Sequence, residues 1–358
     1  MELLSVTMND GVMPRSEIEG KDNSSEDKSN YKVVLTGDMV YNSMRMWQGA
    51  NGISPCDGIV SPAYTVLMPK FPISNGYFAA LFKSPNLINE FRKNSQGMTS
   101  DTWNLKYPQI GAIKVYIPAL SEQERIANML GTLEKRITKQ AQIVDSLKKY
   151  KRGVMQHIFR QPSTQEGTDW TCVRLSDIFK KVSRRNKNGV VKNVITNSAE
   201  YGLIPQRDFF DKDIAVEGNT ANYFVIEEGD FVYNPRKSNT APYGPFNRYT
   251  LSEKGIISPL YTCLVLQADI NPSYLAWYFK SNSWHRYIYD NGSQGVRHDR
   301  VSMTDDLLMG IPVLFPNRAK QLLFANMLNQ IETRLQATQK ELALLIKAKD
   351  GYVQQLFI

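Results

Sequence analysis

Cysteine and histidine are scarce in this chain of 358 residues, and both shortages exclude kinds of protein. The three cysteines, Cys56, Cys172 and Cys263, are isolated and odd in number, which argues against a disulfide framework and a zinc site. None of the three histidines has metal-ligand spacing to another. No apolar run reaches the roughly 18 residues of a membrane span, and the amino terminus lacks the pattern of a signal peptide. We therefore expect a cytoplasmic protein that makes no membrane contact.

The motifs of several common enzyme classes are also missing. The sequence has no G-x-x-x-x-G-K-[ST] phosphate loop and no glycine-rich dinucleotide fingerprint. Asn234-Pro235-Arg236-Lys237 stands where an adenine methyltransferase would need Asn or Asp, two prolines and an aromatic residue. A nuclease would need a cluster of metal-binding carboxylates, which the sequence does not suggest. We predict that this chain has no catalytic residues and binds no metal or cofactor of its own.

What the sequence does contain is an internal repeat. The segment Gly37–Asn42 (GDMVYN) recurs as Gly229–Asn234 (GDFVYN), and Gly58–Thr65 recurs as Gly255–Thr262. Further along the chain the register between the two copies stays constant at 198 residues. We infer a duplicated unit that consists of a globular module followed by a helix.

Each copy ends in a long stretch whose apolar residues have heptad spacing. The seam positions are Ile126, Leu130, Leu133, Ile137 and Leu147 in the first copy, and Phe324, Leu328, Ile331, Leu335 and Leu345 in the second. Polar residues interrupt both seams at equivalent places, Gln140 and Lys151 in one and Thr338 and Lys349 in the other, and the second seam is predicted to continue through Tyr352. Because each helix has an equivalent partner in the same chain, we predict an antiparallel intramolecular coiled coil.

The modules are predicted to be rich in strands. In the second module, strand-like runs of β-branched and aromatic residues lie at 190–196, 224–226, 230–234 and 260–266, and residues 272–289 have the pattern of one helix. The predicted fold class is α+β, with two mixed α/β domains joined by two long helices and related by a pseudo-twofold axis. The predicted segments are 1–118 (first domain), 119–162 (first helix), 163–315 (second domain) and 316–358 (second helix).

The net charge of +8 favours a polyanionic partner, but its distribution limits that inference. Residues 1–120 carry 11 basic and 11 acidic side chains, and residues 163–315 carry 17 of each. The excess lies in the helices, with 9 against 4 in residues 121–162 and 6 against 3 in residues 316–358. Any nucleic-acid contact in the modules must therefore come from local basic loops. The alternative for the helical charge is a set of lysines that only keep exposed faces solvated.

Four motifs, in their order along the chain, resemble those of one known family. The stretch Ile117–Ala127 (IPALSEQERIA), followed by Tyr150–Phe159 (YKRGVMQHIF), is similar to the central conserved region of type I restriction-modification specificity subunits. Trp170–Ile178 (WTCVRLSDI) looks like the opening of a target recognition domain of that family, and Gly229–Asn234 looks like its middle. The resemblance extends over nearly the whole chain.

The resemblance implies a DNA-reading subunit without catalysis of its own. In the family, two target recognition domains each read one half of a bipartite site, and the paired helices hold them apart over an unread gap. The helices also dock two modification (methyltransferase) subunits, and restriction subunits join that core. The implied partners are double-stranded DNA, two modification subunits and restriction subunits. S-adenosylmethionine, ATP and Mg are then expected on the partner subunits.

Candidate DNA contacts lie in two loops of each module, where polar side chains follow a strand or accompany a glycine. In the second module the candidates are Arg236, Lys237, Tyr243, Gln294, Arg297 and Arg300. In the first module they are Arg45, Gln48, Gln96 and Thr99, with Arg15 as a weaker candidate. For each of these residues the alternative is an ordinary exposed turn. Because the two sets differ, we predict that the modules read different half-sites.

The first copy departs from the family pattern at its beginning. In the second module Trp170 precedes Val194–Thr196 by some 25 residues, whereas the first copy has the matching Val6-Thr7 close to Met1. About twenty residues of the opening strand and loop are therefore expected to be missing from the first recognition domain. This difference predicts stronger DNA recognition through the second module.

One function from another class stays open at this point. The chain could be a coiled-coil scaffold whose modules bind protein or carbohydrate and whose helical lysines serve solubility. Co-purification separates the two hypotheses, because only a specificity subunit is expected to bring down a methyltransferase.

Overall fold

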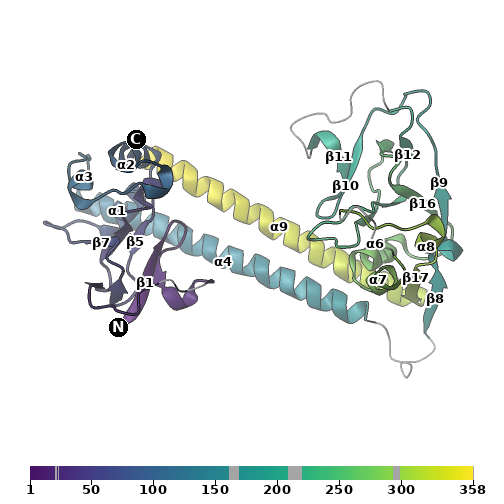
Figure 1. Ribbon diagram of the computed structural model, residues 1–358, viewed down its shortest axis with the longest axis horizontal. Coiled ribbons are helices and arrows are strands. Elements are labelled where there is room, and N and C mark those ends of the chain that lie inside the picture. Colours follow the sequence, from purple (N-terminus) through teal and green to yellow (C-terminus); the bar gives the residue numbers. More distant parts are fainter. Residues whose placement is uncertain (21, 23, 161–168, 209–219, 293–298, 358) are drawn as a thin grey trace. The chain divides into compact units, whose positions relative to one another are not determined.

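The computed structural model describes residues 1–358 apart from 21, 23, 161–168, 209–219, 293–298 and 358. The chain divides into two compact units, Met1–Asp145 with Ala337–Ile358, and Ser146–Gln336. Each unit contains one module and a segment of both long helices, α4 (Leu120–Ile158) and α9 (Arg318–Leu356), which have 39 residues each (Figure 1). No helix in the part of the chain covered by the structure combines the length and apolar character that crossing a membrane requires.

The first module, which precedes α4, has two small sheets and three short helices. One sheet has the order β2-β1-β6-β3 and the other the order β5-β4-β7. The strands are β1 (Glu2–Thr7), β2 (Gly11–Pro14), β3 (Lys32–Val34), β4 (Met39–Asn42), β5 (Asn51–Ile53), β6 (Gly58–Val60) and β7 (Tyr64–Leu67). The α-helices are α1 (Asn75–Leu81), α2 (Pro85–Asn94) and α3 (Tyr107–Gly111), and η1 (Arg15–Glu17), η2 (Met46–Gln48) and η3 (Ser100–Thr102) are short 3-10 turns.

The second module, between α4 and α9, contains counterparts of the strands and α-helices of the first module, with additions. Its largest sheet has the order β14-β13-β16-β9, and three pairs accompany it, β10-β11, β12-β15 and β17-β8. The strands are β8 (Trp170–Arg174), β9 (Phe179–Val182), β10 (Ile195–Ser198), β11 (Gly202–Pro205), β12 (Phe224–Ile226), β13 (Phe231–Tyr233), β14 (Phe246–Arg248), β15 (Gly255–Ile257), β16 (Thr262–Leu266) and β17 (Pro312–Pro316). The helices are α5 (Leu175–Ile178), α6 (Pro272–Lys280), α7 (His285–Asn291) and α8 (Asp305–Met309), with a 3-10 turn η4 (Gln206–Asp208).

The prediction of one helix over residues 272–289 was wrong, because the chain breaks between α6 and α7. Ser281 adopts an extended conformation, its hydroxyl donates to the Tyr278 carbonyl at 2.6 Å, and it accepts from the Ser283 amide at 3.3 Å. Serine side chains of this kind compete with helical hydrogen bonds. The break lets Trp284, which is 1% exposed, pack against Phe279 inside the core.

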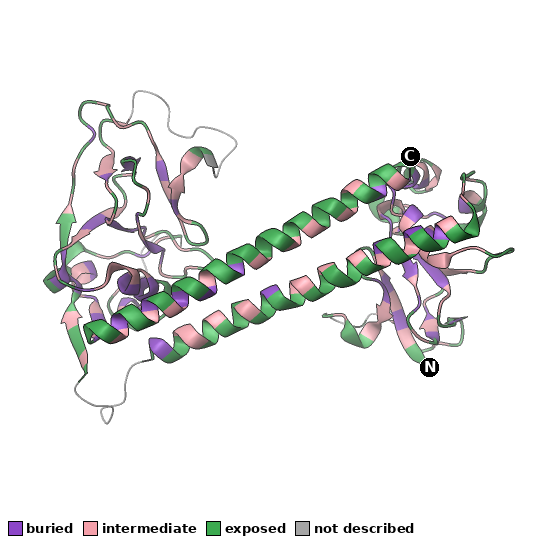
Figure 2. Ribbon diagram, turned by 180° about the vertical axis from the view of Figure 1, so that it is seen from behind, coloured by how far each residue is buried: buried purple, intermediate pink, exposed green. Residues whose placement is uncertain are grey.

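The antiparallel pairing of α4 and α9 is confirmed inside each unit. In the first unit Ile126 and Leu130, near the start of α4, share a core with Val353 and Phe357 at the end of α9. In the second unit the residues at the end of α4 share a core with those at the start of α9. The predicted seam residues are buried at Ile126, Leu130, Leu328, Ile331 and Leu335, and half-buried at Leu133, Ile137, Leu147, Phe324 and Leu345. Most other residues along both helices are exposed (Figure 2).

The seam prediction was wrong at Tyr352, which is 46% exposed, whereas the neighbouring Val353 is 9% exposed. A straight α-helix drifts by about 20° per heptad relative to an exact seven-residue repeat. Near the end of α9 this drift turns Val353 rather than Tyr352 toward α4. The side chain of Phe357 then lies against Tyr77 of the first module, with ring centres 5.4 Å apart.

A buried glutamine connects each module to the start of its own long helix. Gln123 donates from Nε2 to the Pro118 carbonyl at 2.9 Å and accepts from the Ser74 amide at 3.0 Å. Gln321, at the equivalent position of the repeat, makes the same two contacts, with the Pro316 carbonyl and the Asn271 amide, both at 2.8 Å. Because both amide groups are buried and satisfied, they fix the angle at which the chain enters each helix.

The polar residues that interrupt the seams pair across the two helices. Lys349 Nζ lies 2.7 Å from Glu134 Oε1 in the first unit, and Lys151 Nζ lies 2.9 Å from Glu332 Oε2 in the second. Gln140 donates to the Thr338 carbonyl at 3.3 Å. Polar groups at seam positions have partners in only one alignment of two helices, so these contacts specify the register.

A third charged residue, contributed by the module, lies near each of these ion pairs. In the first unit it is Lys83, whose pKa is lowered by burial and by Lys349 and raised by Glu134. In the second unit it is Lys280, whose pKa is lowered by burial and by Lys151 and raised by Glu332. Its ammonium lies 4.8 Å from the centre of the Trp277 ring. We call these groups the Lys83 cluster (Lys83, Glu134, Lys349) and the Lys280 cluster (Lys280, Glu332, Lys151). Each cluster joins a module to both long helices.

Replacing Glu332 by Gln is expected to lower the free energy of unfolding by about 1–2 kcal/mol at neutral pH, because two lysines lose their counter-charge. Burial raises the pKa of the Glu332 carboxyl, but the hydrogen bond from Lys151 and the charges of both lysines lower it more, so it lies below the ordinary 4.5. A carboxylate of lowered pKa stabilises the fold above its ordinary pKa, and this contribution is lost as the pH falls through the lowered value.

Urea unfolding of wild type and E332Q should therefore differ at pH 7 and converge as the pH falls through the lowered pKa of Glu332. The matched control is E341Q. Glu341 also pairs across the helices, with Arg136 at 3.1 Å, but both side chains are about half exposed or more. Its removal should change the unfolding free energy by less than about 1 kcal/mol. Equal effects of the two substitutions would contradict the role of the Lys280 cluster.

Candidate nucleic-acid interface

Two of the predicted loops of the second module lie side by side. The loop after β13 forms an antiparallel bridge with the segment before α8, in which Arg236 is opposite Arg300. The Lys237 amide donates to the Asp299 carbonyl at 2.8 Å, and the Val301 amide donates to the Pro235 carbonyl at 2.9 Å. The structure thus brings together three predicted DNA contacts, Arg236, Lys237 and Arg300. We call residues 234–243 with 299–301 the second-module loop pair.

The charged side chains of this loop pair are available to a ligand. Arg236 has a side chain that is 67% exposed, and that of Arg300 is 34% exposed. Asp299 lies between them, with its Oδ2 at 3.7 Å from Arg236 Nε and 3.9 Å from Arg300 Nε. Exposed ion pairs at these distances are weak. A phosphate or a guanine edge could replace the carboxylate as the partner of either guanidinium.

Three buried asparagines support the second-module loop pair. Asn197 on β10 donates to the Val232 carbonyl at 2.9 Å, and Asn247 on β14 donates to Asn197 Oδ1 at 2.8 Å. Asn234 donates from Nδ2 to the Asn197 carbonyl at 3.3 Å and accepts from the Arg236 amide at 3.0 Å. These asparagines were not predicted, because a buried amide network has no local signature in the sequence. It holds the backbone of Arg236 in a defined turn.

Tyr243, the remaining described candidate of this loop, is half-buried and belongs to an aromatic group. Its ring centre lies 4.9 Å from that of His285, and its carbonyl accepts from the Tyr233 hydroxyl at 2.8 Å. Burial lowers the pKa of His285 to about 4, so this imidazole is neutral at physiological pH. The position of Tyr243 therefore fits a role in shaping the loop better than a direct contact with a phosphate.

A polar hollow of about 390 Å³ opens beside the second-module loop pair. Pro235 and Val301 of the loop pair line it, together with Tyr261 and with Lys181 and Asp305, which form an ion pair. Lys181 was not among the predicted contacts. In the sequence, Lys181 is marked only by its place shortly after the motif Trp170–Ile178. That position alone does not distinguish it from the other lysines of the module.

Two further candidates, Gln294 and Arg297, lie outside the residues that the structure describes. They remain predictions from the sequence.

The first module brings its two candidate loops together through aromatic side chains. The turn η2 carries Trp47, whose ring centre lies 5.1 Å from that of Trp103 in the segment after α2. The Arg92 guanidinium lies over the Trp47 ring at 5.7 Å. This contact joins the loops that correspond in the repeat to the loop pair of the second module, but it is made by two aromatic side chains, whereas the bridge of the second module joins Arg236 and Arg300. We call residues 44–48 with 95–104 the first-module loop pair.

The predicted residues of the first-module loop pair differ in exposure. Arg45 and Gln48 are half-buried beside Trp47, whereas Gln96 and Thr99 are exposed. Gln96 exchanges two backbone hydrogen bonds with Asn104, at 3.0 and 2.8 Å. The backbone is therefore held while the side chains of Gln96 and Thr99 face solvent. This arrangement can present polar groups, but it has less positive charge than the second module.

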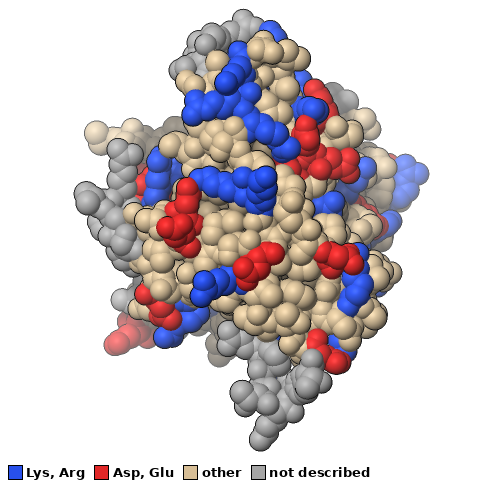
Figure 3. Space-filling model, turned by 90° about the vertical axis from the view of Figure 1, so that its right-hand side faces the viewer, with Lys and Arg blue, Asp and Glu red and all other residues tan. Residues whose placement is uncertain are grey.

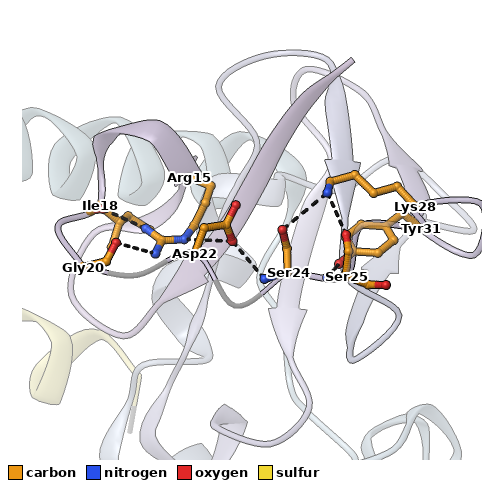
Figure 4. Close-up of polar contacts among 8 residues, drawn as sticks. All are labelled: Arg15, Ile18, Gly20, Asp22, Ser24, Ser25, Lys28 and Tyr31. Atoms are coloured by element: carbon orange, nitrogen blue, oxygen red, sulfur yellow. Dashed lines mark hydrogen bonds and ion pairs between the residues drawn. The ribbon is translucent and has the colours of Figure 1, made fainter.

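Arg15 has a structural role in the first module. Its guanidinium donates to the Ile18 carbonyl at 2.7 Å and to the Gly20 carbonyl at 3.2 Å, and its Nε lies 3.7 Å from Asp22 Oδ1 (Figure 4). The side chain is 17% exposed. Its donors are directed at its own loop, which explains why this arginine is a weaker candidate for DNA contact. Nearby, Lys28 donates to the Ser25 carbonyl at 2.8 Å.

The charge of the surface is mixed rather than uniformly positive. On the face that Figure 3 shows, Lys and Arg side chains gather mainly in the upper part, and acidic side chains lie among and below them. Across the described ranges, no group of three or more His, Cys, Asp or Glu side chains is placed to hold a metal ion.

The fold and the loop pairs define a class of protein, in which two related α+β modules are carried by an antiparallel pair of helices. Residues 7–149 match the family model of the type I restriction modification DNA specificity domain. The match spans the first module and most of α4, and it confirms the resemblance noted in the sequence. No curated protein is similar enough in sequence to count as a match.

Solved structures share the fold along nearly the whole chain. The S subunit of the type I restriction-modification system from M. genitalium has a TM-score of 0.57 and 12% identity, over 99% of this chain and 94% of that one. A chain from a structure on complex assembly and conformational transition of the type I R-M system has a TM-score of 0.53 and 17% identity, over 93% of this chain and 84% of that one. At these identities the similarity establishes the fold.

Proposed function

We propose that this chain is the DNA specificity subunit of a type I restriction-modification system and that each module reads one half of a bipartite site. The observation that carries the proposal is that the same loop pair occurs in both modules with different side chains. The second presents Arg236, Lys237 and Arg300, and the first presents Gln96 and Thr99, in a loop whose Trp103 packs on Trp47. A duplicated scaffold with two different sets of polar groups is suited to two different half-sites.

The paired helices are proposed to set the unread gap and to dock two modification subunits. Both helices have 39 residues, and their register is specified by the Lys83 and Lys280 clusters. Several large apolar side chains on them are exposed, as is common where a partner protein binds. These residues are Met129, Ile143, Tyr150, Leu322, Leu323, Leu344 and Ile346.

In this proposal the chemistry belongs to the partners. The modification subunits would bind S-adenosylmethionine and methylate adenine, and restriction subunits would use ATP and Mg to cut DNA. An adenine has to leave the base stack to be methylated, which requires an enclosed pocket on the methylating subunit. The specificity subunit then needs only to fix the position of that subunit along the duplex. Such a complex would act in the cytoplasm.

Co-expression with the neighbouring methyltransferase gene tests the proposal. We expect a complex with two methyltransferase copies, and methylated adenines within one bipartite sequence in the host DNA. Purification without any methyltransferase, together with unmethylated DNA, would instead favour a scaffold that binds other partners. The matched control is the methyltransferase expressed alone, which should give no sequence-specific methylation.

A further inference from the structure

An exposed arginine beside the first-module loop pair is stacked on an aromatic ring and has no acidic partner. Arg92 lies in the last turn of α2, and its guanidinium lies 5.7 Å from the centre of the Trp47 ring. Among the side chains that the structure describes, no carboxylate forms an ion pair with Arg92. The carboxylate of Glu90, on the same helix, pairs with Lys93 at 2.8 Å. The positive charge of Arg92 is therefore available to a ligand.

The packing around Arg92 holds its guanidinium in one orientation. The preceding residue, Phe91, is 1% exposed and belongs to the core of the first unit, which fixes the rotation of α2. The Trp47 ring is fixed as well, because its Nε1 donates to the Met44 carbonyl at 3.2 Å and its edge packs against Trp103. Stacking on an aromatic ring uses the face of a guanidinium and leaves the N–H donors at its edge free.

The second module uses the equivalent helix differently. The counterpart of α2 is α7, whose corresponding turn contains Tyr289 and Asp290. Arg286 of α7 also lies near an aromatic ring, 6.0 Å from the centre of Tyr289, but its Nε is 2.7 Å from Asp290 Oδ2. This arginine is neutralised by a carboxylate of its own helix. The two modules therefore place their available arginines at different points of one scaffold.

We propose that Arg92 reads a guanine in the half-site of the first module and that Trp47 positions it. The inference rests on the proposed function and names a base and a residue within it. The O6 and N7 acceptors of guanine lie in one plane, so a guanidinium whose plane is fixed can donate to both. A phosphate is also bound well by a lysine that acts as a point charge, so it does not require the stack.

The position of Arg92 in the chain agrees with this role. The loop that follows α2 carries the exposed side chains of Gln96 and Thr99, which can donate to or accept from neighbouring base edges. Arg92 adds to these neutral groups the positive charge that the first-module loop pair has in short supply. It was not predicted from the sequence, because the contact between α2 and Trp47 depends on tertiary structure.

The test measures base preferences in the assembled methyltransferase complex, where the first half-site is the one that Arg236→Ala leaves unchanged. Arg92→Ala should lower the preference for guanine at one position of that half-site by at least about fivefold. At the same position 7-deazaguanine, which lacks the N7 acceptor, should weaken binding by the wild type and leave binding by Arg92→Ala unchanged. The preferences at the second half-site should stay the same, which shows that the variant is folded.

Three further variants separate reading from charge and from packing. Arg92→Lys keeps the charge but loses the fork of donors, so it should lose the preference for guanine and keep the salt dependence of the affinity. Trp47→Leu should weaken that preference by a smaller factor, with guanine still favoured, because the guanidinium remains but is no longer held. The matched control is Lys93→Ala, which removes a neighbouring charge and should change no base preference.

Two results would overturn this inference alone. One is a first half-site that contains no G·C pair. The other is an Arg92→Ala complex that keeps every base preference and binds with a weaker salt dependence, since that indicates a phosphate contact. A host without any bipartite methylated sequence would refute the proposed function, and this inference with it.

Discussion

Replacing Arg236, Lys237 and Arg300 together by alanine is expected to weaken specific DNA binding by about a hundredfold or more at physiological salt. Arg236 and Arg300 are opposite each other on one antiparallel bridge, and Lys237 is the next residue, so the triple variant removes the local positive charge of the second-module loop pair. The fold should be kept, because the backbone of the loop is held by Asn234 and by main-chain hydrogen bonds that alanine retains.

The measurement is the affinity of the assembled methyltransferase complex for its own site, taken at several salt concentrations. Each phosphate contact that is lost should reduce the salt dependence of the affinity by roughly 0.9 in the logarithmic slope, whereas a lost contact with a base leaves that slope unchanged. The three single variants then show whether each of these residues contacts a phosphate or a base. Arg236→Ala should relax specificity at one position if the guanidinium reads guanine.

The matched control is Lys254→Ala. Lys254 is 61% exposed in the same module and pairs with Glu227 at 2.7 Å, away from the second-module loop pair in the sequence. Its removal should change the affinity by a small factor that depends on salt. An affinity that is equal for the wild type and the triple variant would show that this module binds DNA elsewhere.

The paired helices were predictable because their signal is repeated many times. Heptad spacing recurs in both copies at a constant offset of 198 residues, and even the interruptions at Lys151 and Lys349 coincide. The structure shows the role of these two lysines, since Lys151 pairs with Glu332 and Lys349 pairs with Glu134, each across the two helices. The partner could not be predicted, because several acidic residues lie within reach of each lysine in the sequence.

The candidate interface was predictable only in part. Glycine and polar residues after a strand indicated the loops, but the bridge between Arg236 and Arg300 joins segments 64 residues apart. Such pairing depends on tertiary structure, and the buried amide of Asn197 that supports it looks like any other asparagine in the sequence. For Arg15, the sequence did not show that its guanidinium donates to carbonyl groups of its own loop.

Inserting one heptad in both long helices is expected to lengthen the unread gap of the recognised site by about three base pairs. Seven residues add roughly 10.5 Å of helix, and one base pair adds about 3.4 Å. The insertions would duplicate residues 137–143 in α4 and the equivalent residues 335–341 in α9. These segments lie between the Lys83 and Lys280 clusters on both helices, so the register of each cluster is retained.

Mapping of methylated adenines in a host that carries the altered gene and its partners measures the gap. A heptad adds almost no rotation to a coiled coil, whereas three base pairs turn the duplex by nearly a third of a turn. The variant should therefore methylate the longer site less efficiently than the wild type methylates the original site. The half-site sequences themselves should stay the same, because the loop pairs are untouched.

An insertion in α4 alone is the decisive comparison. Glu134 and Lys151 on α4 would then lie seven residues further apart, whereas Glu332 and Lys349 on α9 would keep their present spacing. The ion pairs Glu134–Lys349 and Lys151–Glu332 could therefore not form at the same time. Methylation should be lost at the original site and at the longer one. If the double insertion instead keeps the original spacing, the helices do not set the gap, and the distance between half-sites must be fixed by the partner subunits.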